Sequence, residues 1–126
     1  MASFLSPLLR ASSPDGLRLV NTTTGQVVAS RLLPAFDSAS RKTGLLKHQS
    51  LPPGTAMVIA PCSAVHTFFM QFPIDVIFVA KDGRVLKVRR DMAASRITAS
   101  LRAFATIEVA AGTAAVDVGH VLSVTP

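Results

Sequence analysis

The sequence predicts an α+β domain, built as a mostly antiparallel small β-barrel or rolled sheet with one or two short helices. Many short apolar or alternating runs are separated by turn signals, which is typical of short antiparallel strands. The sequence lacks the alternation of strands and long helices that would indicate a parallel sheet. The chain has 126 residues, of which 49% are apolar. This is enough for one domain with its own core.

Residues 1–15 are expected to form a loose or disordered N-terminal arm, followed by a single compact domain over residues 16–126. The arm holds a short apolar patch that Pro7 interrupts, and it ends in the turn cluster Ser12–Gly16. It has no basic start, and its apolar part is too short for a signal peptide. The interruption at Pro7 also disfavours membrane attachment through the arm.

The first part of the domain predicts a hairpin and a helix. Residues 17–20 and 26–30 flank a loop that ends in Gly25, a residue that tolerates the left-handed conformation. A helix is expected from Asp37 or Ser38, either of which suits the N-cap, to Lys47. Gly44 weakens the helix and suggests an early end.

The remaining chain predicts short strands joined by turns. Residues 76–80 are apolar on both faces, as in a strand buried on both sides. Asp82-Gly83 favours a tight hairpin turn. Residues 93–101 look irregular, and one or two helical turns are expected within 111–118. The expected strands are 57–60, 66–70, 76–80, 85–92, 105–110 and 120–124.

Composition narrows the classes of function. A net charge of +6 permits an anionic partner, but the chain lacks Trp and Tyr, which disfavours a base-stacking surface for nucleic acid. The single cysteine, Cys62, excludes an internal disulfide and fits a reducing, cytoplasmic compartment. The three His are too far apart for a short metal-ligand motif, so neither a metal nor a cofactor is expected. No apolar run is long enough to span a membrane.

Two acids stand in apolar surroundings. Asp75 opens the most apolar strand, where a carboxylate must find partners or take up a proton. It either accepts backbone N–H bonds or meets an arginine, or it serves as an acid or ligand-binding group in a pocket. The side chain of Glu108 points to the other face of its strand from those of Ile107 and Val109, so it either faces water or pairs with a basic residue. The basic candidates are Arg84, Lys87, Arg89, Arg90, Arg96 and Arg102.

Two segments carry a resemblance to a known family. The first is the run from Ala64 to Val79, which combines a strand, a Met, a Pro-Ile-Asp kink and an apolar strand; the second runs from Ile107 to Thr113. With Leu51–Gly54 and Asp82–Val85, they resemble domain of unknown function 192 over about residues 17–125. The resemblance implies a compact β-rich domain and no established reaction, cofactor or partner. Gly119-His120 stands where family members often have Gly-Asp.

Two hypotheses for function follow. The first is a non-catalytic binding or protein-interaction domain for an unknown ligand or protein, with binding candidates His66, Phe69, Met70, Asp75, Arg89 and Arg90. The alternative is a small hydrolytic enzyme that uses Asp75, Glu108 and His66 as acid, base and orienting group. The alternative requires these side chains to face one cleft, and carboxylates on opposite sides of a sheet would exclude it. The sequence leaves the oligomeric state open.

Overall fold

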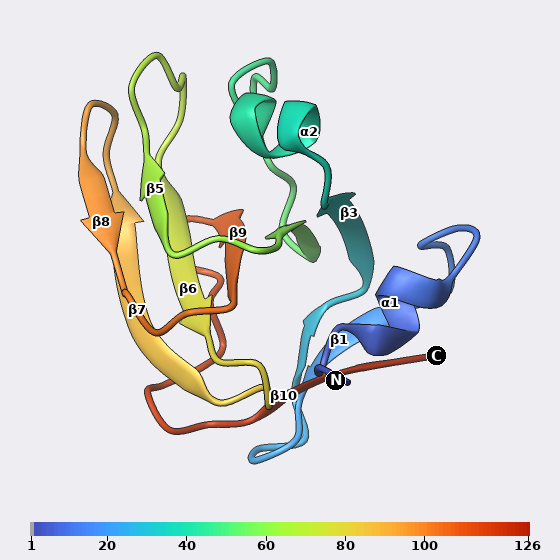
Figure 1. Ribbon diagram of the computed structural model, residues 1–126. Coiled ribbons are helices and arrows are strands. Elements are labelled where there is room, and N and C mark those ends of the chain that lie inside the picture. The colour runs from blue at the N-terminus through green and yellow to red at the C-terminus, as the bar shows by residue number, and fades with distance from the viewer. Residues whose placement is uncertain (1) are drawn as a thin grey trace.

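The structure is a computed structural model that describes residues 2–126 (Figure 1). Its two helices are short: α1 (Ser6–Arg10) and α2 (Ser38–Thr43). The strands are β1 (Arg18–Asn21), β2 (Val27–Ala29), β3 (Arg31–Ala35), β4 (Thr55–Ile59), β5 (Ala64–His66), β6 (Ile74–Val79), β7 (Val85–Met92), β8 (Ile97–Ala99), β9 (Ala105–Ala110) and β10 (Leu122–Thr125). The protein is therefore β-rich, with two short helices.

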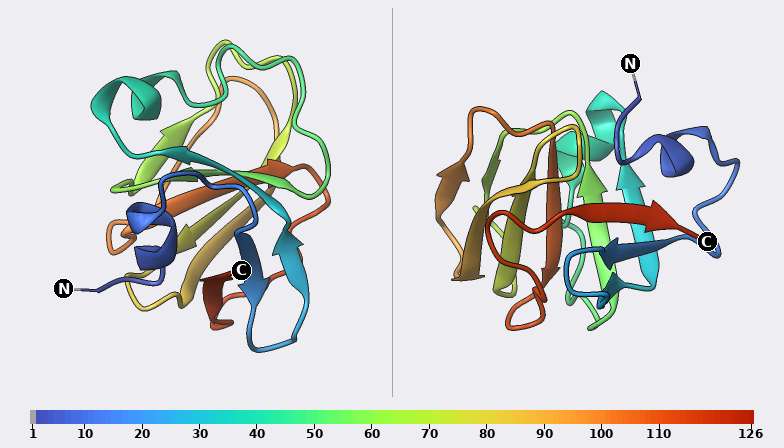
Figure 2. Two further views of the ribbon diagram at one scale, coloured as in Figure 1. Left: turned by 90° about the vertical axis from the view of Figure 1, so that its right-hand side faces the viewer. Right: turned by 90° about the horizontal axis from the view of Figure 1, so that it is seen from below.

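The strands form one central sheet and two smaller ones. The central sheet has the order β3-β4-β9-β6-β7, and only the β3–β4 pair is parallel. The smaller sheets, β10-β1-β2 and β5-β8, are antiparallel. Strands β1 and β10 run across the end of the central sheet beside α1 (Figure 2).

The predicted mostly antiparallel pairing is confirmed, but the barrel alternative is wrong. Strands β3 and β7 are the two ends of the central sheet and do not pair with each other. Pro34 lies in β3, where it lacks the N–H that a further strand would need. The sheet therefore stays open at this edge.

The central sheet carries an apolar core on each face. On one face, strands β4, β6 and β9 pack against α1, β1 and β10, burying among others Leu5, Leu19, Val58, Ile77, Ile107 and Leu122. On the other face the same strands pack against the segment after α2 and the chain around β5, burying Leu45, Leu51, Met57, Met70, Val76 and Phe78. Strand β6 is thus buried on both faces, as its continuous apolar run predicts.

The segment expected to be a loose arm packs onto the domain. Phe4, Leu5 and Leu8 are buried in the first core, and Leu5 is fully covered. The backbone N–H of Phe4 also donates to the carbonyl of Lys81, at the β6–β7 turn (2.9 Å). The apolar patch of the arm is therefore part of the core.

Several local predictions fit and others do not. Asp37 caps α2 as expected: its carboxylate accepts from the Ser40 N–H at 2.8 Å, and this bond, with a second from the Ser40 hydroxyl, lowers the pKa of Asp37. The helix ends at Gly44 (φ 45°) rather than continuing to Lys47. Strand β5 ends at His66 instead of reaching Met70, and β3 and β8 arise where the sequence shows no clear strand.

Asp75 holds the central sheet to its neighbours on the first face. Ile74 is opposite Met92 and Val76 is opposite Arg89, so a bulge in β7 lies beside Asp75. The Asp75 Oδ1 accepts from the N–H of Asp91 in this bulge (2.8 Å). Its Oδ2 accepts from the N–H groups of Gly112 and Ala114, each at 3.0 Å. The prediction that backbone N–H groups satisfy Asp75 is confirmed.

The helix expected within 111–118 is absent, and the chain runs there as a loop. The N–H groups of Gly112 and Ala114 donate to Asp75, and the N–H of Thr113 donates to the carbonyl of Ala110 in a turn. Arg90 holds the loop from outside, where its guanidinium donates to the carbonyls of Ala114 (2.8 Å) and Val116 (2.5 Å). The loop is thereby fixed in an extended path.

We expect Asp75→Asn to lower the free energy of unfolding by roughly 2–4 kcal/mol, because the amide places N–H groups where the backbone N–H groups of Gly112 and Ala114 need an acceptor. Urea denaturation measures the change. Asp15→Asn, at an exposed acid whose carboxylate accepts no hydrogen bond within residues 2–126, is the matched control and should change stability by less than about 0.5 kcal/mol. Equal effects of the two variants would contradict the role assigned to Asp75.

Gly83 generates a second stability prediction. It has φ 95°, and a Cβ at this position would collide with the backbone oxygen of Leu122 in β10. Gly83→Ala should cost more than about 3 kcal/mol, because left-handed strain is added to a backbone clash. Gly25→Ala, with a similar φ of 81° and open space around it, should cost only about 1 kcal/mol in the same urea experiment. Comparable losses would show that the contact with β10 is unimportant.

Candidate functional site

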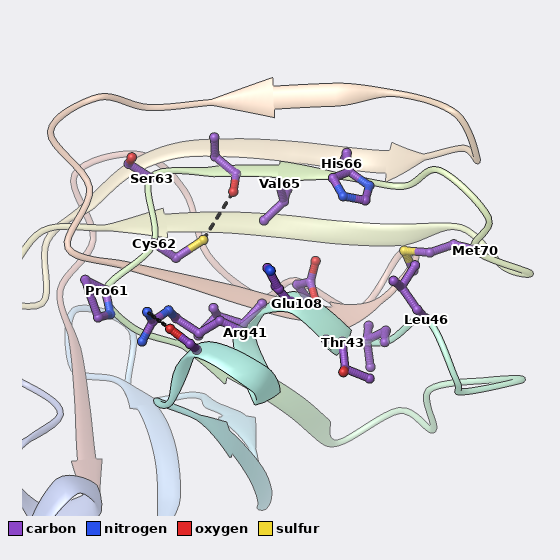
Figure 3. A pocket seen from close by; sticks show the side chains of 16 residues that line it. Arg41, Thr43, Leu46, Pro61, Cys62, Ser63, Val65, His66, Met70 and Glu108 are labelled. Carbon is purple, nitrogen blue, oxygen red and sulfur yellow. Dashed lines mark hydrogen bonds between the residues drawn. The ribbon is translucent and has the colours of Figure 1, made fainter.

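A pocket of about 510 Å³ lies between α2 and β5, on the second face of the central sheet (Figure 3). Helix α2 and the residues after it contribute Arg41, Lys42, Thr43, Leu45 and Leu46. The chain after β4 contributes Pro61, Cys62, Val65, His66 and Met70. The sheet itself contributes Ile59 and Glu108. The pocket is thus lined by apolar and polar side chains in similar proportion, with Glu108 in the sheet and two basic residues on α2.

Glu108 forms part of the floor of this pocket. It alternates with the core residues Ile107 and Val109 in β9, and it lies beside Met57 of β4 and Val76 of β6. The residue is only 3% exposed, and desolvation raises the pKa of its carboxyl from 4.5 to about 7. Within residues 2–126 its side chain makes no hydrogen bond or ion pair, and its carboxyl oxygens reach the open space of the pocket, since no fully enclosed side-chain oxygen there lacks a partner. Both sequence expectations for Glu108, a wet strand face and a basic partner, are therefore wrong.

His66 and Cys62 also line the pocket. His66 ends β5, is exposed, and has its ring centroid 5.4 Å from that of Phe68. The Cys62 thiol donates to the carbonyl of Ala64 (3.2 Å) rather than to a base. Figure 3 shows Cys62, Val65 and His66 along one side of the pocket and Glu108 below them.

Asp75 does not reach this pocket. Residues directly opposite each other in an antiparallel pair share a face, and Asp75 is opposite Val109 whereas Glu108 is opposite Val76. Asp75 and Glu108 therefore lie on opposite faces of the central sheet. The convergence of Asp75, Glu108 and His66 on one cleft, which the hydrolytic alternative requires, does not occur; of the three, only Glu108 and His66 line the same pocket.

The other binding candidates are distributed differently. Met70 lines the pocket, and the adjacent Phe69 projects into solvent, 88% exposed and with a positive φ of 66°. Such a φ is strained for an aromatic residue. Arg89 is exposed on β7, opposite Val76, and is not among the residues that line the pocket. Arg90 lies at the β7 bulge and holds the Ala114–Val116 loop.

Sequence reasoning does not single out the pocket residues of the α2 segment. Arg41 and Lys42 are two basic residues on a short helix, a pattern equally typical of a solvated surface. Only the apposition of α2 and β5 makes them part of a site. Within residues 2–126, no group of three or more His, Cys, Asp or Glu side chains is placed to hold a metal ion. Over the same residues, no helix is long and apolar enough to cross a membrane.

Two solved structures share the fold. One is described as a "putative transcription regulator" from Sinorhizobium meliloti 1021, with a TM-score of 0.73, 21% identity, and coverage of 85% of this chain and 90% of that chain. The other is a protein of unknown function from Novosphingobium aromaticivorans DSM 12444, with a TM-score of 0.73, 20% identity, and coverage of 85% and 82%. At these identities the likeness concerns the fold.

Comparison with curated proteins gives no match. The model of one family, DUF192, described as "Uncharacterized ACR", matches residues 19–124. This range contains all strands of the central sheet and every residue that lines the pocket, whereas Phe4, Leu5 and Leu8 of the first core precede it. The chain therefore belongs to the DUF192 family, whose function is unknown, as the resemblance of its central and C-terminal segments predicts.

Proposed function

We propose that this protein is a non-catalytic binding module that holds a small ligand in the pocket between α2 and β5. The observation that carries the proposal is Glu108, a buried carboxyl without a partner in the described chain, which lines an open pocket. A buried acid in apolar surroundings destabilises a protein unless something satisfies it. A ligand that completes its hydrogen bonds would recover this free energy as affinity.

Binding is supported better than hydrolysis by the positions of the polar groups. The hydrolytic alternative needs Asp75 as a second acid in the cleft, and this carboxylate is on the other face with three backbone donors around it. The pocket holds His66 and Cys62, but the Cys62 thiol donates to a carbonyl instead of a base. One carboxyl, apolar walls and a basic helix are the components of a binding site.

The proposal includes a small-molecule partner and a reducing, cytoplasmic compartment. Some of the basic residues are already occupied internally, since Lys87 donates to the carbonyl of Ala99 (2.9 Å) and Arg90 to two carbonyls. This supports a small ligand over nucleic acid, which needs basic groups free for phosphates. The free thiol of Cys62 supports the reducing compartment.

A variant in which a larger side chain fills the pocket tests the proposal. Val65→Phe enlarges a side chain on the pocket wall and should abolish the binding of small compounds that the unmodified protein retains in a fragment screen by NMR. Val27→Phe makes the same change on β2, at a residue 45% exposed and outside the pocket, and should leave binding intact. Compounds that bind equally to both variants, or a screen without any binder, would overturn the proposal.

Glu108 should also give the protein a distinct pH dependence. The pKa of Glu108 is about 7 in the folded chain, against an ordinary value of 4.5, so the folded chain binds this proton more tightly than the unfolded chain. The stability gained in this way is fully present below pH 4.5 and is lost as pH rises through 7. The loss should total roughly 3 kcal/mol. Urea denaturation at pH 4.5, 6 and 8 should show this decline in the unmodified protein and not in Glu108→Gln. Parallel pH profiles would contradict the buried, unpartnered state of Glu108.

A further inference from the structure

We infer that the pocket takes a small zwitterion: an ammonium group directed at Glu108, an apolar chain along the walls, and an acidic group near Lys42. The inference rests on the proposed function and adds the chemical class of the ligand. It follows from three features of the pocket, namely its floor, its walls and the charges that face it.

Glu108, at the floor of the pocket, favours a ligand with a cationic hydrogen-bond donor. Glu108 is almost fully covered and lies between Met57 and Val76 of the adjacent strands. No group within residues 2–126 donates to its carboxyl oxygens, which reach the open space of the pocket. An ammonium group supplies up to three N–H donors and a compensating charge to one carboxylate. A neutral ligand supplies donors without the charge, and an anionic ligand adds repulsion to the ionised carboxylate.

The walls call for an apolar body. Between the floor and the surface the pocket is bordered by Ile59, Leu45, Leu46, Val65 and Met70. Figure 3 shows Leu46 and Met70 at one end of the pocket and Val65 above Glu108. A methylene chain buried here gains about 0.8 kcal/mol for each CH₂ removed from water.

The remaining charges call for an acidic group at the opposite end of the ligand. The other charged or titratable groups that line the pocket with Glu108 are Arg41 and Lys42 of α2, His66 of β5 and the Cys62 thiol. The Arg41 guanidinium already donates to the carbonyl of Phe36 (2.6 Å), whereas the side chain of Lys42 makes no hydrogen bond or ion pair within residues 2–126. A simple amine would face two cations at α2, and a simple carboxylate would leave Glu108 without a donor. A zwitterion satisfies both ends.

Three compounds of equal chain length separate these possibilities: 6-aminohexanoate, hexylamine and hexanoate. Titration calorimetry at pH 6 should give 6-aminohexanoate an affinity at least tenfold higher than that of either single-ended compound. Glu108→Gln and Lys42→Gln should each lower the affinity for 6-aminohexanoate about tenfold. Lys47→Gln, at an exposed lysine of the same segment outside the pocket, should leave it unchanged.

Proton release provides a readout that a loss of packing would not mimic. Because an ammonium group favours the ionised carboxyl, binding at pH 6 should release a proton from Glu108, seen as a dependence of the heat on the buffer's ionisation enthalpy. The release should persist in His66→Gln and disappear in Glu108→Gln.

Equal affinity for hexanoate and 6-aminohexanoate, or undiminished binding to Glu108→Gln, would overturn the inference. If other compounds bind in a way that Val65→Phe abolishes while the three-compound series shows no preference for the zwitterion, only the ligand class is wrong. If nothing binds the pocket in either experiment, the proposed function falls as well.

Discussion

The fold depends on the three hydrogen bonds that the Asp75 carboxylate accepts. One bond satisfies the N–H of Asp91 in the bulge of β7, and two bring the chain after β9 against the same face. The carboxylate offers two acceptor oxygens to these three donors, whereas an amide of the same size offers only one. The bulge of β7 and the loop after β9 are thus both held by this one residue in β6.

Much of the fold is predictable from the sequence because its signals are local. The apolar run of β6, the Asp82-Gly83 turn and the alternation in β9 each predict what forms. Strands β3 and β8 are not predictable in this way, since their short, mixed sequences become strands only by pairing with β4 and β5. The loop over 111–118 is not predictable in this way either, because the acceptor of its Gly112 N–H is 37 residues away in the sequence.

The candidate site shows where sequence reasoning stops. Alternation correctly places Glu108 on the other strand face from Ile107 and Val109. The apolar run correctly places Asp75 at the start of a buried strand. Whether the two acids share a face depends on the register between β6 and β9, which no single strand reveals. With Asp75 opposite Val109, the acids point away from each other, and a hypothesis based on their convergence fails. The basic side chains of α2 join Glu108 only through the tertiary arrangement.

The two buried acids divide the sheet into a structural face and a face suited to a ligand. Asp75 has its donors built into the backbone, so its surroundings are rigid and complete. Glu108 has none within the described chain, and the wall above it is α2, a helix of six residues of which none is buried. A second hollow, of about 350 Å³ and lined by Pro34, Ala39 and Met57 among others, lies against the same helix. The helix is capped at Asp37 and has open space against it in both pockets. A buried acid and a helix without buried residues therefore lie around one pocket, and this is the combination that the proposed binding module requires.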